Sequence, residues 1–204
     1  MGALLNRRRY MGGSSSSQYD AEIGYLESTG GCIIDTGYIP TGDDIRIQTK
    51  VLYNGYVSGG QWIAWYSAYS GETYNTYRII RSRNTNNAVL FNNGSRAGNG
   101  NTTITNITIG DVYTIDLNRL QYDINGITGT LMNVVGTENT GSMTVFSELF
   151  KGRFYYFRIS KNDVLKLDLI PVRVGQTGYM YDRVSGTLFG NSGTGDFILG
   201  PDKT

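Results

Sequence analysis

The sequence predicts an all-β fold of antiparallel strands, and three observations support this prediction. The 204 residues include 28 Gly and 16 Tyr but only 17% charged residues, a composition typical of short strands joined by tight turns. Apolar residues recur at every second position in several segments, and no segment shows helical spacing. With only three prolines, central strands keep their backbone donors. All-β domains of roughly 200 residues are commonly single domains, so we expect one folded body.

Residues 45–53 alternate most clearly, with Ile45, Ile47, Thr49, Val51 and Tyr53 on one face and mostly polar side chains on the other. Shorter alternations occur in residues 112–118, in 154–159, and in Leu165, Leu167 and Leu169. These segments are expected to be strands that cover a core on one side. Residues 92–101 are expected to form a loop and residues 102–109 a further strand.

Turn residues separate these segments. Asn125-Gly126 stands between two short apolar segments, and both residue types tolerate the positive φ values of a type I′ hairpin. Asn93-Gly94 is a second candidate for such a turn. Lys161-Asn162-Asp163 joins two strong strand signals and predicts a third hairpin.

The first 19 residues differ from the rest and are expected to form a basic arm with a Gly/Ser tether, followed by the body at 20–204. An arm that combines apolar anchors with a charge cluster can dock onto another protein, and the alternative is a disordered, solvated N-terminus. The candidate partner-binding residues are Leu4, Leu5, Arg7, Arg8, Arg9 and Tyr10.

The net charge of +1 conceals an asymmetry between arm and body. Without Arg7, Arg8 and Arg9, 15 Lys and Arg face 17 Asp and Glu, which leaves −2 for the remainder. A body of that sign has no broad field to attract nucleic acid, so we expect no direct nucleic-acid role. No stretch approaches the length of a membrane span.

Cys32 is the only cysteine, which excludes an intrachain disulfide and fits folding in a reducing cytoplasm. Its neighbours Ile33 and Ile34 predict a buried, inert thiol. A signal peptide is not predicted, because Gly and Ser follow the basic run where an apolar region should stand.

The chain has no histidine, which excludes a Ser-His-Asp triad, a Cys-His pair and a histidine metal site. Paired carboxylates would still permit glycoside hydrolysis. However, no strand carries acidic residues in an E-x-D-x-x-E spacing, so we expect a protein that is not an enzyme.

The aromatic run at 61–69 is the candidate contact surface, because sugar rings stack on exposed aromatic platforms. The candidate carbohydrate-binding residues are Trp62, Trp65, Tyr66 and Tyr69. The alternative is that these rings pack in the core, and the same applies to the aromatics at 154–157.

Calcium is the one cofactor considered, and no cofactor is expected. Asp182, Asn191 and Asp196 could donate oxygen ligands to Ca²⁺. The preferred interpretation is that they form Asx-turns.

Three sequence segments together resemble one known family. They are GYLESTGGCIIDTGYIP at 24–40, KGRFYYFRISKNDVLKLDLIPV at 151–172 and GYMYDRVSGTLFGNSGTGDFILGP at 178–201. They are similar to the LamG-like (concanavalin A-like) jelly-roll modules in virion proteins of tailed bacteriophages that infect gut Bacteroidetes. The opening LLNRRRYMGG at 4–13 looks like a leader found on structural proteins of such phages.

This resemblance implies an antiparallel two-sheet jelly-roll sandwich with an extended N-terminal arm. It further implies a non-enzymatic virion structural protein, an auxiliary or decoration subunit of the capsid head, assembled in the bacterial host cytoplasm. The partners would be other virion proteins, with host or mucosal glycans as further ligands. The alternative is a carbohydrate-binding or receptor-binding module of a tail fibre or adhesin.

Overall fold

A computed structural model describes residues 18–41, 44–55, 62–68, 75–82, 89–93, 101–104, 108–118, 121–130, 141–148 and 150–204; for 55, 62–68, 75–82, 89–93 and 101–104 it describes the backbone alone. Across these ranges the chain forms strands and turns and no helix, which confirms the predicted all-β fold. The strands are β1 (Ala21–Glu22), β2 (Leu26–Ser28), β3 (Ile34–Asp35), β4 (Ile45–Gly55), β5 (Trp62–Ala68), β6 (Asn75–Ser82), β7 (Val89–Asn93), β8 (Asn101–Ile104), β9 (Val112–Asn118), β10 (Gln121–Ile124), β11 (Ile127–Thr130), β12 (Thr144–Val145), β13 (Lys151–Lys161), β14 (Val164–Val174), β15 (Thr177–Asp182), β16 (Leu188–Phe189) and β17 (Ile198–Leu199).

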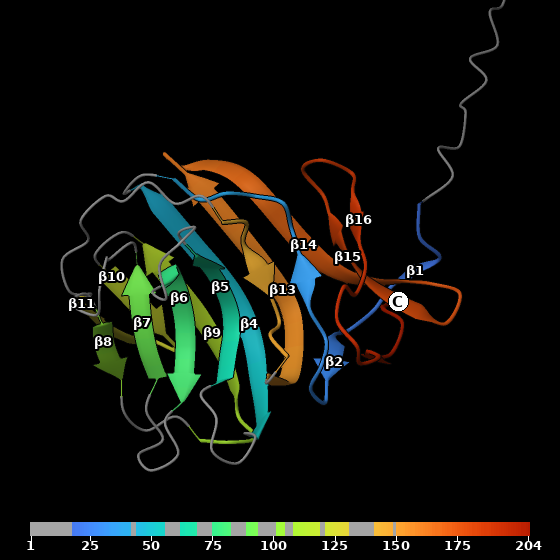
Figure 1. Ribbon diagram of the computed structural model, residues 1–204, viewed down its shortest axis with the longest axis horizontal. Helices are drawn as coiled ribbons and strands as arrows, with labels where there is room; N and C mark the ends of the chain where they lie inside the picture. The colour runs from blue at the N-terminus through green and yellow to red at the C-terminus, as the bar shows by residue number, and fades with distance from the viewer. Residues whose placement is uncertain are drawn as a thin grey trace, which may run out of the picture.

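The described strands form one large and one small antiparallel sheet (Figure 1). The large sheet runs in the order β11-β10-β9-β4-β13-β14-β15-β16, and β1, β2 and β17 join it beside this path. The small sheet runs β3-β12-β5-β6-β7-β8. Strand β13 is central to the large sheet, because it pairs with β4 along its length and with β2 and β14 on its other edge.

Both sheets contribute to one buried cluster. Ile34 and Val145 come from the small sheet, and they belong to the same cluster as Ile47, Phe154 and Leu117 of the large sheet. On β4 the residues predicted to face the core, Ile45, Ile47, Thr49, Val51 and Tyr53, are all buried. The face of the large sheet that carries Ile47 is therefore its inner face, and the face that carries the alternate residues is called the outer face below.

Two of the predicted hairpins are confirmed. Asn125 and Gly126 have φ values of 50° and 84° between the paired strands β10 and β11. Asn162 and Asp163 have φ values of 50° and 59° between β13 and β14. Positive φ at both central residues matches the twist of the flanking strands. At the third candidate turn, Gly94 lies outside the described residues.

A bulge in β13 changes the alternation predicted for residues 154–159. Phe154 and Tyr156 pair with consecutive residues of β4, so Tyr155 is an extra residue in the ladder. Phe154 and Phe157 are both fully buried, although they are three positions apart. Tyr155 and Tyr156 are half-buried. The bulge thus keeps a phenylalanine on the inner face at each side of two tyrosines.

A similar irregularity interrupts the predicted apolar row of β14. The pairing with β13 skips Lys166, which makes it the extra residue there. Leu167 and Leu169 are buried as expected, but Leu165 is 41% exposed. The prediction is therefore wrong for Leu165.

The strand predicted over 102–109 is also partly wrong. Strand β8 ends at Ile104, residues 105–107 lie outside the described part, and Thr108 to Gly110 lead through a turn into β9. The Tyr113 hydroxyl accepts a hydrogen bond from the Thr108 N–H at 2.7 Å, which holds this turn. Ile109 is 44% exposed and does not reach the core.

The start of the described chain lies beside its end. Ile23 forms a bridge with Asp202, and Arg173 of β14 binds the Asp202 carboxylate through two hydrogen bonds of 2.7 Å. The Asp20 carboxylate accepts a hydrogen bond from the Gly175 N–H at 2.6 Å. The first described residues are therefore fixed along β14. Among the described residues, no helix is long and apolar enough to cross a membrane.

Candidate functional site: a polar groove on the large sheet

The residues singled out from the sequence as contact surfaces lie largely outside the described part of the chain. This holds for all six arm residues, Leu4, Leu5, Arg7, Arg8, Arg9 and Tyr10, and for Tyr69. Trp62, Trp65 and Tyr66 belong to β5 of the small sheet, where the backbone alone is described. Both contact surfaces therefore stay predictions.

The strand register assembles a polar site that these predictions missed. Across β11, β10, β9 and β4, one row of paired residues on the outer face is Thr128, Asp123, Asp116 and Gln48. The neighbouring row, two residues further along each strand, is Thr130, Gln121, Asn118 and Arg46. The two rows place hydroxyl, carboxylate, amide and guanidinium groups on one face, because side chains on a strand alternate with period two.

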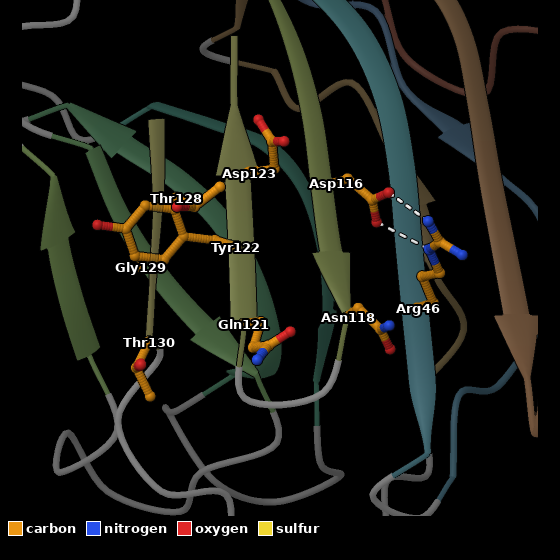
Figure 2. A pocket seen from close by; sticks show the side chains of 9 residues that line it. All are labelled: Arg46, Asp116, Asn118, Gln121, Tyr122, Asp123, Thr128, Gly129 and Thr130. Carbon is orange, nitrogen blue, oxygen red and sulfur yellow. Dashed lines mark hydrogen bonds and ion pairs between the residues drawn. The ribbon is translucent and has the colours of Figure 1, made fainter. Parts of the chain in front are cut away.

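Seven of these eight side chains line a groove of about 550 Å³ (Figure 2). Tyr122 and Gly129, which pair with each other across β10 and β11, complete its lining. A second hollow of about 350 Å³ lies next to it and shares Asp116 and Asp123. The two hollows together are called the polar groove below.

One wall of the groove is fixed by an ion pair between neighbouring strands. Arg46 Nε and Nη2 donate to the two oxygens of Asp116 at 2.9 and 2.5 Å, and Gln48 Nε2 donates to Asp116 Oδ2 at 2.9 Å. Burial raises the pKa of Asp116, but the hydrogen bonds from Arg46 and Gln48 and the Arg46 charge outweigh this, so the pKa is lowered overall. The hydrogen bond to Asp116 raises the pKa of Arg46 in turn.

Asp116 and Asp123 form a cross-strand carboxylate pair. They are direct partners on β9 and β10, so their Cβ atoms lie about 4.5–5.5 Å apart. Asp123 Oδ1 accepts the Gly126 N–H at 2.7 Å, which leaves the other oxygen for a ligand. Spacing of acids along a single strand does not predict this pair, because its two members come from neighbouring strands. The short connection at 119–120 between the two strands, combined with the hairpin at Asn125-Gly126, was the signal that could have found it.

A row of tyrosines continues the outer face beyond the groove. Tyr155 and Tyr156, which the bulge turns outward together, lie on β13, and Tyr25 contacts the Tyr155 ring edge-on with centroids 5.9 Å apart. Each ring carries a cation: Arg153 lies 4.2 Å from the Tyr25 centroid, Lys50 lies 5.1 Å from that of Tyr155, and Arg158 lies 4.9 Å from that of Tyr156. These cations stabilise the rings in place and cover part of their faces.

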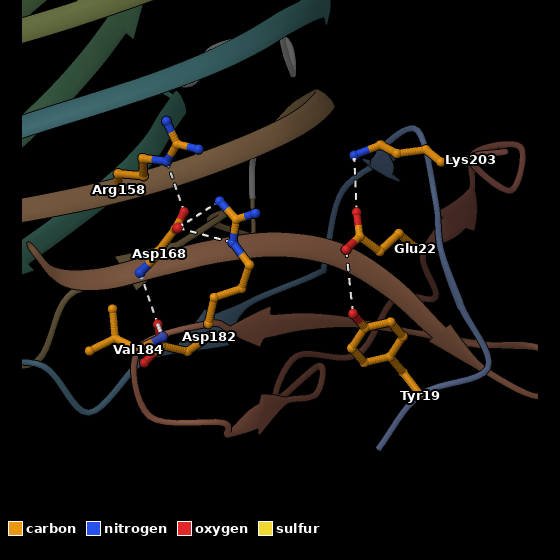
Figure 3. Close-up of polar contacts among 8 residues, drawn as sticks. Tyr19, Glu22, Arg158, Asp168, Asp182, Val184 and Lys203 are labelled. Carbon is orange, nitrogen blue, oxygen red and sulfur yellow. Dashed lines mark hydrogen bonds and ion pairs between the residues drawn. The ribbon is translucent and has the colours of Figure 1, made fainter. Parts of the chain in front are cut away.

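Two of the three residues considered as calcium donors, Asp182 and Asn191, hold local turns. Asp182 is 2% exposed, and its carboxylate accepts hydrogen bonds from the N–H groups of Asp168, Val184 and Ser185 at 2.8 to 3.1 Å (Figure 3). Asn191 Oδ1 accepts the N–H of Gly193 at 2.9 Å. The preferred interpretation of Asp182 and Asn191 as Asx-turn residues is therefore confirmed. In the described ranges no three acidic or cysteine side chains gather as metal ligands would.

A second ion-pair network stabilises the part of the large sheet that is formed by β13, β14 and β15. Asp168, 5% exposed, binds Arg158 Nε at 2.8 Å and Arg183 Nη2 at 2.7 Å (Figure 3). It links β13, β14 and the turn after β15, and both of its oxygens are used. Cys32 is fully buried, which confirms the predicted burial of its thiol, and desolvation raises the pKa of that thiol.

Comparison with models of known protein families gives no match for this chain, and comparison with curated proteins gives none either.

Proposed function

We propose that this protein is a non-enzymatic structural subunit of a tailed-phage virion. Its body would be a jelly-roll sandwich displayed on the capsid head, and its arm would anchor it to other virion proteins. The three sequence segments at 24–40, 151–172 and 178–201 and the all-β fold support this proposal. Assembly would take place in the bacterial host cytoplasm.

The proposed separation of arm and body rests on where the described core begins. Among the described residues, every member of the buried cluster comes from Ile23 onward. The chain is already fixed at Asp20, whose N–H donates to the Arg173 carbonyl at 2.9 Å. Tyr19, the last residue of the predicted arm, packs against Tyr181 with tilted rings whose centroids lie 4.9 Å apart. The described core therefore begins at Ile23, and the proposal assigns the residues before 18 to a partner.

Asp116 in the groove does not have the pKa shift of a general acid. A general acid in glycoside hydrolysis needs a raised pKa. Asp116 has the opposite, a lowered pKa, because Arg46 and Gln48 hold it as a carboxylate. A carboxylate fixed in this way accepts hydrogen bonds from a ligand and does not deliver a proton.

The docking role is tested by deleting residues 2–13 and, separately, by replacing Arg7, Arg8 and Arg9 with alanine. Both variants are expected to unfold at the same urea concentration as the full chain. Both should be lost from particles when the chain is supplied in trans to a phage that lacks it. A folded variant that enters particles at the normal copy number would exclude anchoring by the arm.

Glycan recognition is the second candidate function, as a module of a tail fibre or adhesin or on the head itself. The polar groove favours it, because amide, hydroxyl and carboxylate groups side by side suit a polyhydroxylated ligand. A glycan array with the full chain tests this function separately from particle incorporation.

A further inference from the structure

We propose that the polar groove on the outer face of β9, β10 and β11 is a binding site for a neutral oligosaccharide, in which Asn118, Gln121 and Asp123 make the main hydrogen bonds. This inference rests on the second function, glycan recognition, and is independent of docking by the arm. It assigns recognition to the large sheet and not to the aromatic run of β5, which belongs to the small sheet.

The groove offers hydrogen-bonding groups that the protein itself does not use. Within the described part of the chain, the side chains of Asn118, Gln121, Thr128 and Thr130 have no hydrogen-bond partner, and all four are exposed. Amides and hydroxyls each offer both donors and acceptors. Sugar hydroxyls also act in both ways, so neighbouring hydroxyls on one ring can pair with this set.

The charges of the groove select against anionic ligands. Arg46 is neutralised by its two hydrogen bonds to Asp116, so Asp123 remains as an unbalanced negative charge. A phosphate, a sulfate or a uronic acid placed here would be repelled by Asp123. A neutral sugar would instead donate a hydroxyl hydrogen bond to the carboxylate, which is stronger than a neutral pair.

Tyr122 bounds the groove from the inner side of the sheet, because it pairs with Leu117 and packs against the buried cluster. The Tyr122 side chain lies against Gly129 so closely that a β-carbon on residue 129 would overlap its hydroxyl end. Glycine at this position therefore lets the ring lie across β11 on the inner face, while Thr128 and Thr130 face the outer side. The two adjoining hollows, of about 550 and 350 Å³, give room for a chain of more than one sugar.

The test uses the full chain on an array of neutral oligosaccharides built from hexoses, deoxyhexoses and N-acetylhexosamines, with sulfated and uronate-bearing sugars for contrast. The Kd of the strongest neutral binder is then measured for Asp123→Asn, for the double variant Asn118→Ala/Gln121→Ala, and for Gln176→Ala. Gln176 is the matched control, since it is an exposed amide in the turn between β14 and β15. Urea unfolding checks that each variant is folded.

We expect Kd to rise about tenfold or more for the two groove variants, and to stay within about twofold for Gln176→Ala. The emission of Trp62 and Trp65, the only tryptophans, should not change on binding. Neutral-glycan binding that the groove variants leave unchanged would overturn this site while leaving glycan recognition in place. Absence of any neutral binder, or a preference for sulfated sugars, would overturn the site, and absence of binding to every sugar on the array would remove glycan recognition as well.

Discussion

Deleting the single residue Tyr155 should leave the fold intact, although one-residue deletions within strands normally destroy the pairing. Tyr155 is the extra residue in the ladder between β13 and β4, so its removal brings Tyr156 next to Phe154 without changing any pair with β4. Phe154 and Phe157 would both stay on the inner face. The register of the strand therefore predicts tolerance at this position.

The cost of this deletion follows from the contacts that Tyr155 makes. Its edge contact with Tyr25 at 5.9 Å is worth about 0.5–1.5 kcal/mol. The contact with Lys50 at 5.1 Å adds about 0.5–1 kcal/mol. The free energy of unfolding should thus fall by about 1–2.5 kcal/mol, and the dependence of that free energy on urea should keep its slope.

Deletion of Thr114 is the matched control. Thr114 is exposed, but it occupies a regular position in β9, which pairs with β4 and β10. Without it, Tyr113 and Ile115 become neighbours, and one of these two buried side chains must face outward. We expect a loss of about 4 kcal/mol or more, from exposed apolar surface and broken ladder bonds. Urea unfolding followed by tryptophan emission measures both variants, and equal losses for the two deletions would show that the bulge does not set the register.

Two further predictions concern buried and paired carboxylates. Asp182→Ala should lower the free energy of unfolding by about 3 kcal/mol or more, because the buried N–H group of Asp168 and the part-buried N–H group of Ser185 lose their acceptor, and a loss under about 1 kcal/mol in urea unfolding would contradict that role. The pKa of Asp116 is lowered in the folded state, so its contribution is present above the unfolded value of 3.8 and is lost as the pH falls through the folded value. Asp116→Asn should therefore cost only about 0.5–1 kcal/mol at pH 7, because the pair is partly exposed, and the difference from the unaltered chain should shrink as the pH falls below 3.8; a difference that grows in acid would reverse the sign of the argument.

The parts of the fold that could be predicted depend on local signals. Alternation in 45–53 and in 112–118 identified β4 and β9, because one buried face leaves a period of two in the sequence itself. The turns at Asn125-Gly126 and Asn162-Asp163 were predictable for the same reason, since positive φ restricts which residues can stand there.

The bulges and the groove depend on pairing between strands, which leaves no such local signal. Nothing in the run from Phe154 to Phe157 distinguishes an extra residue from a regular one, so the strict alternation expected there was wrong. The groove combines residues of four strands. In the sequence, each of its polar residues is indistinguishable from an ordinary exposed polar residue. Only the register places Asp116 against Asp123 and Arg46 beside Asn118.

The structure of an assembled phage particle that contains this chain is the decisive measurement for a displayed body with an anchoring arm. We expect density for Leu4 to Tyr10 packed against neighbouring virion chains, with the polar groove of β9 and β10 facing solvent. A particle in which the body is held through the polar groove, with the first 13 residues in contact with no other chain, would contradict both the anchoring role and the assignment of the groove to a sugar.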